Sequence, residues 1–413
     1  MRRFRRFSFI VAFVAILIAA TSTAAFAVPE FRETADQYIL LNLRASEMQA
    51  DTLKKIKALK DSAEPGSPRL GVGIIISYFR NTPAENLEFL RRLLKLCQEQ
   101  ELAVIVQLDG EQWWPARPDL WNWWDKNRRG YDPANAANVE WSDWGSEHAL
   151  KIAWRNWGRQ VRVLPPPNLM SQRYREACHV EMQPLVEEVV RWRSELPEDK
   201  RWLLVGVKVG WESAIGMGSH YYPNGNELAD KDSANDPQQK AQPKVLPGRG
   251  FQPIGYAAVS TSGLANSGEL KEEHLAEVIR RHLADLSSVV RRAGLPREQI
   301  FTHCGGWAEG ERLYRSALND DACPGWSFYR HARDPRGDKT AMAALAASKA
   351  PYWGAVEWLP IGAKTPDDWQ AALRYTLATD RCRYLCIYNW RQIENDTTAQ
   401  AGIRRALGEP ISK

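Results

Sequence analysis

The sequence lacks the motifs that define several common enzyme classes. It has no Gly-x-Ser-x-Gly elbow, which argues against an α/β-hydrolase esterase. It has no phosphate-cradling Gly-Lys-Ser/Thr loop, and Gly71 and Gly73 stand without the rest of a dinucleotide-binding fingerprint. The seven histidines show no zinc-site spacing. We therefore expect neither a metal ion nor a nucleotide cofactor.

Strongly basic character is confined to the N-terminus. The chain of 413 residues has a formal net charge of +5, but its first 27 residues hold four arginines and no acidic residue, so the remainder carries +1. No Lys/Arg run or stripe there has the form of a nucleic-acid footprint, so we expect no nucleic-acid partner. Six cysteines are too few for a disulfide scaffold. Cys304 could pair with Cys323, or Cys97 with Cys178, and the sequence does not choose.

The N-terminal segment has the pattern of an export signal. Four arginines within residues 2–6 precede an apolar run over residues 7–20, which is too short to span a membrane comfortably. Ala25-Phe26-Ala27 then offers a small-x-small cleavage site. We therefore predict a signal peptide over residues 1–27, rather than an uncleaved anchor. The protein is expected to be periplasmic or extracellular, without a membrane span after cleavage.

The rest of the chain alternates short β-like runs with amphipathic helical stretches. Eight strands are expected, at residues 38–44, 70–79, 102–109, 202–212, 299–303, 326–330, 352–359 and 383–390. Helices are expected at residues 49–61, 83–100, 171–196, 271–293, 339–349, 366–379 and 397–407. Strands in βα order favour a parallel sheet closed by helices. We therefore predict an α/β fold in which residues 28–413 form a single (β/α)₈ TIM barrel.

Two long stretches interrupt this alternation. Residues 112–170 lie between the third strand and its helix, and residues 215–268 follow the fourth strand. Both insertions leave the C-terminal end of a strand, which is where barrel enzymes build their active sites. Loops of this length in a compact domain are usually functional or disordered.

The period of two along each strand predicts which side chains enter the barrel. In residues 202–212 the apolar odd positions, including Val205, should face the helices, so Lys208 and Glu212 should point inward. In residues 352–359, Glu357 is in phase with Trp353 and Ala355. The same rule turns a further set inward near strand ends: Asn42, Arg44, Gln107, Asp109, Glu111, Cys386, Tyr388 and Trp390. A purely structural barrel would not need polar groups clustered there.

Aromatic residues are abundant around this predicted site. Nine of the 18 tryptophans lie between residues 113 and 157. Their flat faces suit the C–H faces of pyranose rings, although most are expected to pack the insertion. The aromatic side chains most suited to a cleft are Trp113, Trp114, Trp211, Tyr222, Trp307, Trp358 and Trp390. The pattern favours a carbohydrate partner.

Three segments at strand ends resemble the large glycoside hydrolase superfamily called clan A: Gly210-Trp211-Glu212, Val356-Glu357-Trp358 and Tyr388-Asn389-Trp390. The resemblance implies a retaining glycosidase, with Glu212 at the end of the fourth strand as acid/base and Glu357 at the end of the seventh as nucleophile. It also implies that His303 contacts the site, whereas an isolated histidine is more often a satisfied interior residue. One position departs from the family pattern, because the family usually has asparagine where this chain has Trp211.

Other interpretations of these residues stay open at this point. Glu212 and Glu357 could be structural carboxylates paired with a cation, whereas Arg44 could instead hold Glu357 ionised for catalysis. Asp109 and Glu111 could be structural or could supply a different acid. A barrel that binds glycans without cleaving them, or a transglycosylase with the same carboxylates, would also fit. The sequence identifies neither the sugar nor the linkage.

Overall fold

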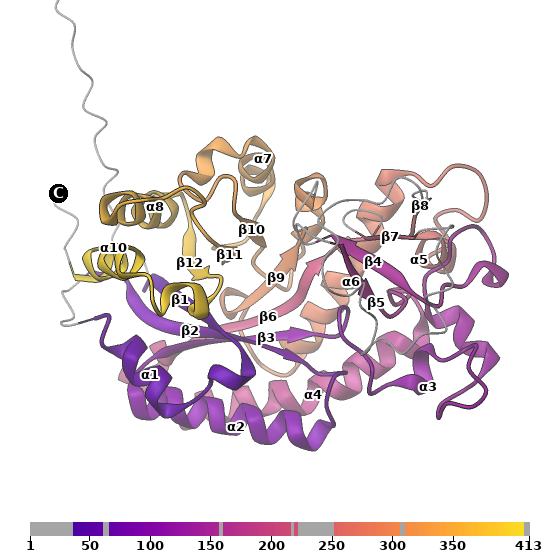
Figure 1. Ribbon diagram of the computed structural model, residues 1–413, viewed down its shortest axis with the longest axis horizontal. Coiled ribbons are helices and arrows are strands. Elements are labelled where there is room, and N and C mark those ends of the chain that lie inside the picture. Colours follow the sequence, from indigo (N-terminus) through magenta and orange to yellow (C-terminus); the bar gives the residue numbers. More distant parts are fainter. Residues whose placement is uncertain are drawn as a thin grey trace, which may run out of the picture.

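The protein is described from a computed structural model (Figure 1). The structure describes residues 36–60, 66–156, 160–215, 219–221, 252–305 and 310–408. The predicted signal peptide, Tyr222 and Trp307 lie outside these described residues. Within the described ranges, no helix is long and apolar enough to cross a membrane.

Eight parallel strands close into a barrel. They are β1 (Tyr38–Leu43), β2 (Arg69–Ser77), β3 (Ala103–Asp109), β6 (Leu204–Ser213), β9 (Ile300–Cys304), β10 (Gly325–Phe328), β11 (Trp353–Trp358) and β12 (Cys382–Ile387). Around the barrel they follow chain order, and β12 pairs with β1 to close it. All of these pairings are parallel. The predicted (β/α)₈ barrel is therefore confirmed.

Helices between the strands form the outer layer (Figure 1). The longer ones are α1 (Ala50–Lys57), α2 (Pro83–Gln100), α4 (Gln172–Glu195), α6 (Glu272–Arg292), α7 (Lys339–Ala347), α8 (Pro366–Ala378) and α10 (Thr397–Gly408). The shorter α-helices are α3 (Pro118–Trp121), α5 (Tyr256–Thr261) and α9 (Trp390–Ile393). The 3-10 helices are η1 (Ala45–Glu47), η2 (Pro133–Asn138), η3 (Ser146–His148), η4 (Glu198–Leu203), η9 (Arg297–Gln299), η10 (Gly310–Ala317) and η11 (Pro335–Gly337). Local signals set helix starts: before Pro83, the Thr82 hydroxyl accepts from the Glu85 amide, and the Glu85 carboxylate accepts from the Thr82 amide.

The strands divide the apolar side chains into two cores. On β1, Leu40 packs inside the barrel, whereas its neighbour Leu41 packs between the strands and the helices. Val205 was expected to face the helices, and this is wrong, because it packs inside the barrel. The reason is a register shift: two consecutive residues of β3 pair with the residues of β6 on either side of Val205. An extra residue of this kind changes which face the following side chains occupy.

β11 also departs from simple alternation. Trp353 and Ala355 pack in the outer core, and Val356 packs inside the barrel. Two consecutive residues of β10 pair with Ala355 and Glu357, so Val356 is an extra residue in β11. Because of this bulge, Glu357 faces the interior although Trp353 and Ala355 do not. The predicted phase of the three residues is therefore wrong, while the predicted direction of Glu357 is right.

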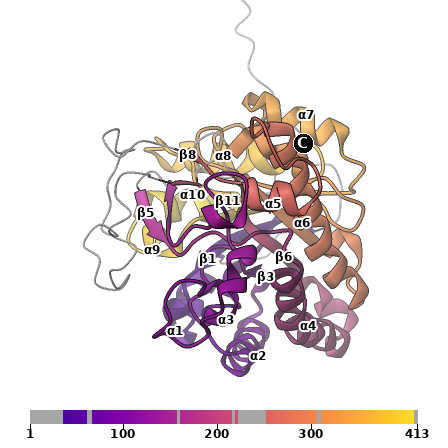
Figure 2. The ribbon, with the colours of Figure 1, turned by 90° about the vertical axis from the view of Figure 1, so that its right-hand side faces the viewer.

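The two long insertions join in a second, smaller sheet beside the barrel (Figures 1 and 2). The first insertion supplies β4 (Ala153–Asn156) and β5 (Gln160–Val163), and the second supplies β7 (Ser219–Tyr221) and β8 (Gln252–Pro253). The sheet order is β5-β4-β7-β8, with antiparallel pairing throughout. The chain segments that follow β3 and β6 thus support one another.

Side-chain contacts reinforce this junction. The Glu140 carboxylate accepts hydrogen bonds of 3.2 Å from the amides of Ala257 and Ala258 at the start of α5. The indole of Trp144 donates to the carbonyl of Gly268 at 2.7 Å. Both contacts join the first insertion to the second, so Glu140 and Trp144 help to hold this layer together.

The six cysteines are all buried, free thiols. Cys304 is the last residue of β9. Cys323 forms a backbone β-bridge with Phe301, which lies three residues before Cys304 along that strand. Three residues of a strand span roughly 10 Å, which exceeds the Cα separation of a disulfide. Cys97 on α2 and Cys178 on α4 are unpaired as well, so neither pairing considered from the sequence is formed.

Candidate active site

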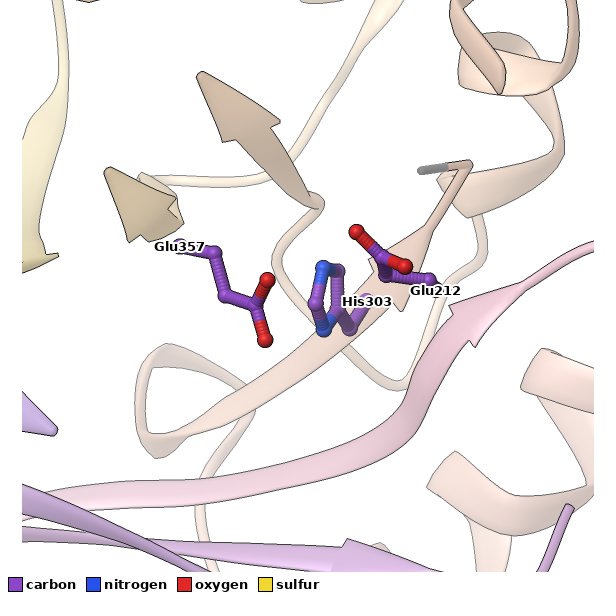
Figure 3. A group of neighbouring side chains, drawn as sticks. All are labelled: Glu212, His303 and Glu357. Carbon is purple, nitrogen blue, oxygen red and sulfur yellow. The ribbon is translucent and has the colours of Figure 1, made fainter. Parts of the chain in front are cut away.

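Glu212 and Glu357 meet at the C-terminal ends of β6 and β11. They retain only 4% and 3% of their surface exposed. One carboxylate oxygen of each, together with a ring nitrogen of His303, lie within 4.8 Å of one another. Figure 3 shows His303 between the two carboxylates in that view. The structure therefore brings together the two residues predicted to be catalytic and the histidine predicted to contact them.

The Glu357 carboxylate is held through both of its oxygens. The hydroxyl of Tyr329 donates to Oε2 at 2.6 Å, and the indole nitrogen of Trp211 donates to Oε1 at 2.7 Å. Burial raises the pKa of Glu357, while the charge of Lys208 and these two donors act in the opposite direction. This arrangement fixes the orientation of the carboxylate and favours its ionised form against the cost of burial.

The end of β6 leaves regular strand geometry to present Glu212. Gly210 and Glu212 have φ angles of +76° and +50°, in the left-handed region. For a residue with a side chain this region costs on the order of 1–2 kcal/mol. Between Val209 and Ser213 the strand gains residues relative to β9. As a result Trp211, directly before Glu212, also reaches the site.

Strain at Glu212 is offset by contacts to its backbone and its carboxylate. The guanidinium of Arg155, on β4 of the first insertion, donates to the main-chain carbonyl of Glu212 at 2.8 Å. The hydroxyl of Ser327, on β10, donates to Oε1 of Glu212 at 3.3 Å. An insertion and a neighbouring strand thus both position this residue.

A buried lysine lies beneath the carboxylates. Lys208 is fully buried, and its ammonium lies 2.8 Å from Nδ1 of His303. Burial lowers the pKa of Lys208 to about 8, although the charges of Glu357, Asp109 and Glu212 raise it. Burial and the charges of Lys208 and Arg155 lower the pKa of His303 well below its ordinary value. The histidine is therefore a neutral ring beside a cation.

Asp109 and Glu111 organise the turn after β3. Oδ1 of Asp109 accepts from the amides of Glu111 and Gln112 at 2.9 and 3.2 Å, and Oδ2 accepts from the Ser77 hydroxyl at 2.9 Å. Burial and the Glu111 charge raise the pKa of Asp109 to about 6. Glu111 itself accepts from the hydroxyl of Ser213 and pairs with His282 at 3.2 Å. Their partners favour a structural role for both carboxylates.

Arg44 does not reach the site. β1 ends at Leu43, and Arg44 is exposed at the start of η1, where its amide donates to the Glu47 carboxylate at 2.8 Å. The interior cation near Glu357 is Lys208 instead. The expectation that Arg44 turns inward to hold Glu357 is therefore wrong, because the chain leaves the barrel one residue earlier.

The predicted aromatic residues divide between site and core. Trp211 contacts Glu357, as described above. The indole of Trp358 donates at 3.0 Å to the carbonyl of Ala332 and to the Thr376 hydroxyl of α8, so Trp358 packs on the helix side of β11. Its expected role as a substrate contact is wrong, because β11 turns its side chain outward.

The remaining predicted tryptophans lie mainly in packed positions. Trp114 is 1% exposed, donates to the carbonyl of Pro165 and packs edge-on against Tyr174. Trp390, the first residue of α9, is 2% exposed and belongs to the outer core. Trp113 is half-buried at the turn after β3. Neither Trp114 nor Trp390 offers an open face to a sugar, so their predicted place in a cleft is wrong.

Two polar residues of β10 and its end were missed by the sequence reasoning. Ser327 contacts Glu212, and Tyr329 contacts Glu357. Their signal is the alternation with Trp326 and Phe328, both of which pack in the outer core. Alternation with these two residues turns Ser327 and Tyr329 inward, but a strand this short and aromatic gives only a weak alternation signal.

A metal ion could find suitable ligand atoms on Glu212, His303 and Glu357, but the contacts of these side chains favour a different role. Both oxygens of Glu357 accept hydrogen bonds, and the two ring nitrogens of His303 contact Lys208 and Ser327. A buried ammonium beside this cluster would repel a metal cation. The donor set fits a hydrogen-bonded carboxylate pair better than a metal centre.

No protein-family model matches this sequence, and no curated protein matches it either. Similar solved structures include the catalytic domain of a β-amylase from Paenibacillus polymyxa, at 9% identity and TM-score 0.49, over 91% of this chain and 100% of that one. A ruminal GH26 endo-β-1,4-mannanase shows 10% identity and TM-score 0.43, over 91% of this chain and 64% of that one. A 3-keto-D-glucoside 4-epimerase from E. coli shows 10% identity and TM-score 0.41, over 90% and 98%. The assignment of the barrel rests on the strand pairings given above and not on these likenesses.

Proposed function

We propose that this protein is a glycoside hydrolase that retains the anomeric configuration of its substrate. The observation that carries the proposal is the approach of Glu212 and Glu357, since one carboxylate oxygen of each lies within 4.8 Å of the other. Retaining glycosidases hold their two carboxyl groups about 5–5.5 Å apart, whereas inverting enzymes leave about 6.5–9.5 Å for a water molecule. An approach of one oxygen from each group within 4.8 Å fits the closer spacing of retaining enzymes, which supports double displacement.

The two carboxyl groups have different surroundings, which supports different roles. Glu357 accepts hydrogen bonds from Tyr329 and Trp211 and lies near the positive charge of Lys208. These three interactions suit an ionised nucleophile. The Glu212 carboxylate accepts a hydrogen bond from the Ser327 hydroxyl at 3.3 Å, and Glu212 lies near the end of β6, the strand end at which the clan A resemblance places the acid/base. Glu212 is therefore the better candidate for the group that gives up and takes back a proton.

The reaction then follows from these positions. Glu212 protonates the glycosidic oxygen, the bond from that oxygen to the anomeric carbon breaks, and an oxygen of Glu357 bonds to the anomeric carbon. The aglycone leaves as an alcohol, and Glu212 is left ionised. Glu212 next takes a proton from water, whose oxygen attacks the same carbon and displaces Glu357. Two displacements restore the starting configuration.

The test is hydrolysis of a panel of oligo- and polysaccharides, followed by proton NMR of the first product anomer. We expect the wild type to cleave at least one glycoside with retention, and Glu357→Gln to lose that activity. Asp109→Asn is a matched control, since Asp109 is an equally buried carboxylate at a strand end outside the proposed pair. Undiminished activity in Glu357→Gln would overturn the assignment. Sugar binding without cleavage by the wild type would favour a glycan-binding barrel, and transfer to sugar acceptors a transglycosylase.

We further propose that the protein acts outside the cytoplasm. The support is the basic and apolar segment over residues 1–27 with its Ala25-Phe26-Ala27 motif. Mass spectrometry of protein recovered from the periplasm or medium of an expressing bacterium should show a new N-terminus after Ala27. A full-length product retained in the cytoplasm would contradict export.

A further inference from the structure

The buried polar groups around Glu212 form a continuous line that crosses three strands. It begins at Lys208 on β6, passes through His303 on β9 and Ser327 on β10, and returns to Glu212 at the end of β6. Lys208 and His303 are fully buried, and Ser327 is 6% exposed. We call these three residues the relay. Burying three polar side chains is costly unless they are hydrogen-bonded, and here each residue contacts the next one in the line.

The direction of each hydrogen bond in the relay follows from chemistry. An ammonium group has donors and no acceptor, so Lys208 donates to Nδ1 of His303 at 2.8 Å. The His303 ring is neutral, so its hydrogen then sits on Nε2 and is donated to the Ser327 oxygen at 2.8 Å. With its oxygen so occupied, the Ser327 hydroxyl donates onward to Oε1 of Glu212 at 3.3 Å.

We infer that Lys208, His303 and Ser327 are positioning residues that determine which oxygen of Glu212 carries the catalytic proton. An oxygen that accepts the Ser327 hydrogen is the carbonyl-like one, so the acidic proton resides on Oε2. The relay thereby fixes the acid in one of its two protonated forms before substrate arrives. This inference rests on the proposed role of Glu212, but the direction of the hydrogen bonds can be tested without any substrate.

Lys208 has a second contribution that the test must separate from the first. Its charge also favours ionisation of Glu357, so removing it disturbs both carboxylates. Ser327 contacts Glu212 and His303, and replacing it interrupts the relay while leaving Lys208 in place. Ser327→Ala is therefore the informative variant, and Ser327→Thr, which keeps the hydroxyl, is the conservative one. Ser287→Ala is a matched control, because Ser287 is a fully buried serine bonded within α6.

The first experiment is nitrogen NMR of the full-length protein labelled with nitrogen-15 histidine, with His303→Asn used to assign the ring. We expect a neutral His303 with hydrogen on Nε2 and none on Nδ1. Lys208→Met should remove the donor to Nδ1 and change the Nδ1 shift or the tautomer. A wild-type ring with hydrogen on Nδ1, or on both nitrogens, would overturn the inference, whatever the enzyme's activity and even if Lys208→Met fails to fold.

The second experiment uses methyl and 2,4-dinitrophenyl glycosides of the sugar that the wild type cleaves. Loss of acid positioning should lower kcat/KM of Ser327→Ala about tenfold for the methyl glycoside, which needs protonation, and less than about twofold for the dinitrophenyl glycoside. Ser327→Thr should recover most of the loss, and Ser287→Ala should show none. Equal losses on both substrates would contradict the inference. A wild type that cleaves nothing would contradict the proposed function instead, and the nitrogen shifts alone would then decide the relay.

Discussion

The indole nitrogen of Trp211 donates a 2.7 Å hydrogen bond to Oε1 of Glu357, across the mouth of the barrel. The residue directly before the proposed acid therefore holds the proposed nucleophile. Family resemblance alone would mark Trp211 as a departure, because asparagine is usual at this position. The structure gives the tryptophan a role of its own, since its hydrogen bond favours the ionised carboxylate and fixes its rotamer.

Replacement of Trp211 by phenylalanine keeps a large ring but removes the N–H donor. A hydrogen bond to a charged group contributes about 1.5–3 kcal/mol, so kcat/KM should fall roughly ten- to a hundredfold. Steady-state kinetics on the cleaved glycoside measure this, with Trp114→Phe as a control in the packed insertion. Wild-type kinetics in Trp211→Phe would show that the contact does not support catalysis.

The two cations considered for Glu357 should behave in opposite ways. Arg44 is exposed, so Arg44→Ala should change kcat/KM by less than about twofold. Lys208→Met should lower kcat/KM about tenfold or more, because the variant loses the positive charge that opposes the effect of burial on the pKa of Glu357. Thermal melting of both variants controls for unfolding. A large loss in Arg44→Ala with little in Lys208→Met would restore the sequence-based assignment.

Glu212→Ala tests the acid/base role separately from the nucleophile. Without the acid, kcat/KM on an unactivated glycoside should fall about 10²–10⁴-fold. A dinitrophenyl glycoside should still form the glycosyl-enzyme, and added azide should then accelerate turnover and yield a glycosyl azide of unchanged configuration. Product analysis by NMR checks this. No azide product, or one of inverted configuration, would argue against Glu212 as acid/base.

Glu140 gives a pH dependence to the junction of the two insertions. Burial raises its pKa from 4.5 to about 8, although the backbone amides it accepts from lower it. The folded protein therefore binds a proton more tightly than the unfolded chain, so this contribution to stability is complete below pH 4.5 and is lost as pH rises from 4.5 to about 8.

Thermal unfolding of the wild type and of Glu140→Gln across this range measures that contribution. The wild type should lose up to about 1.4 kcal/mol per pH unit relative to the variant. The comparison uses the slope with pH, because the amide also changes the hydrogen bonds to Ala257 and Ala258. Parallel curves for the two proteins would mean that Glu140 does not titrate in this range.

The barrel and its inward polar groups follow from the sequence because they depend on local patterns. A period of two over residues 202–212 is enough to turn Lys208 inward, and short apolar runs separated by amphipathic stretches are enough for eight strands. The two carboxylates also follow, since each ends a strand and resembles a known motif.

The errors in strand phase share one physical cause, which is that they depend on neighbouring strands. Val205 and Val356 are extra residues relative to an adjacent strand, and a single sequence carries no signal for such register shifts. Trp358 faces α8 because it alternates with the inward-facing Glu357, so its aromatic character was a misleading signal for a substrate contact. The pairing of β4 with β7 joins segments more than sixty residues apart, which no local periodicity reveals.

The most direct test of the account is to trap the covalent intermediate. A 2-deoxy-2-fluoro glycosyl fluoride of the cleaved sugar should inactivate the enzyme, and mass spectrometry of the digested protein should place one glycosyl group on the peptide that contains Glu357. Glu357→Gln should not be labelled. A label on Glu212 or on another residue, or an inverted product with no label at all, would contradict the assignment of Glu357 as the nucleophile of a retaining glycosidase.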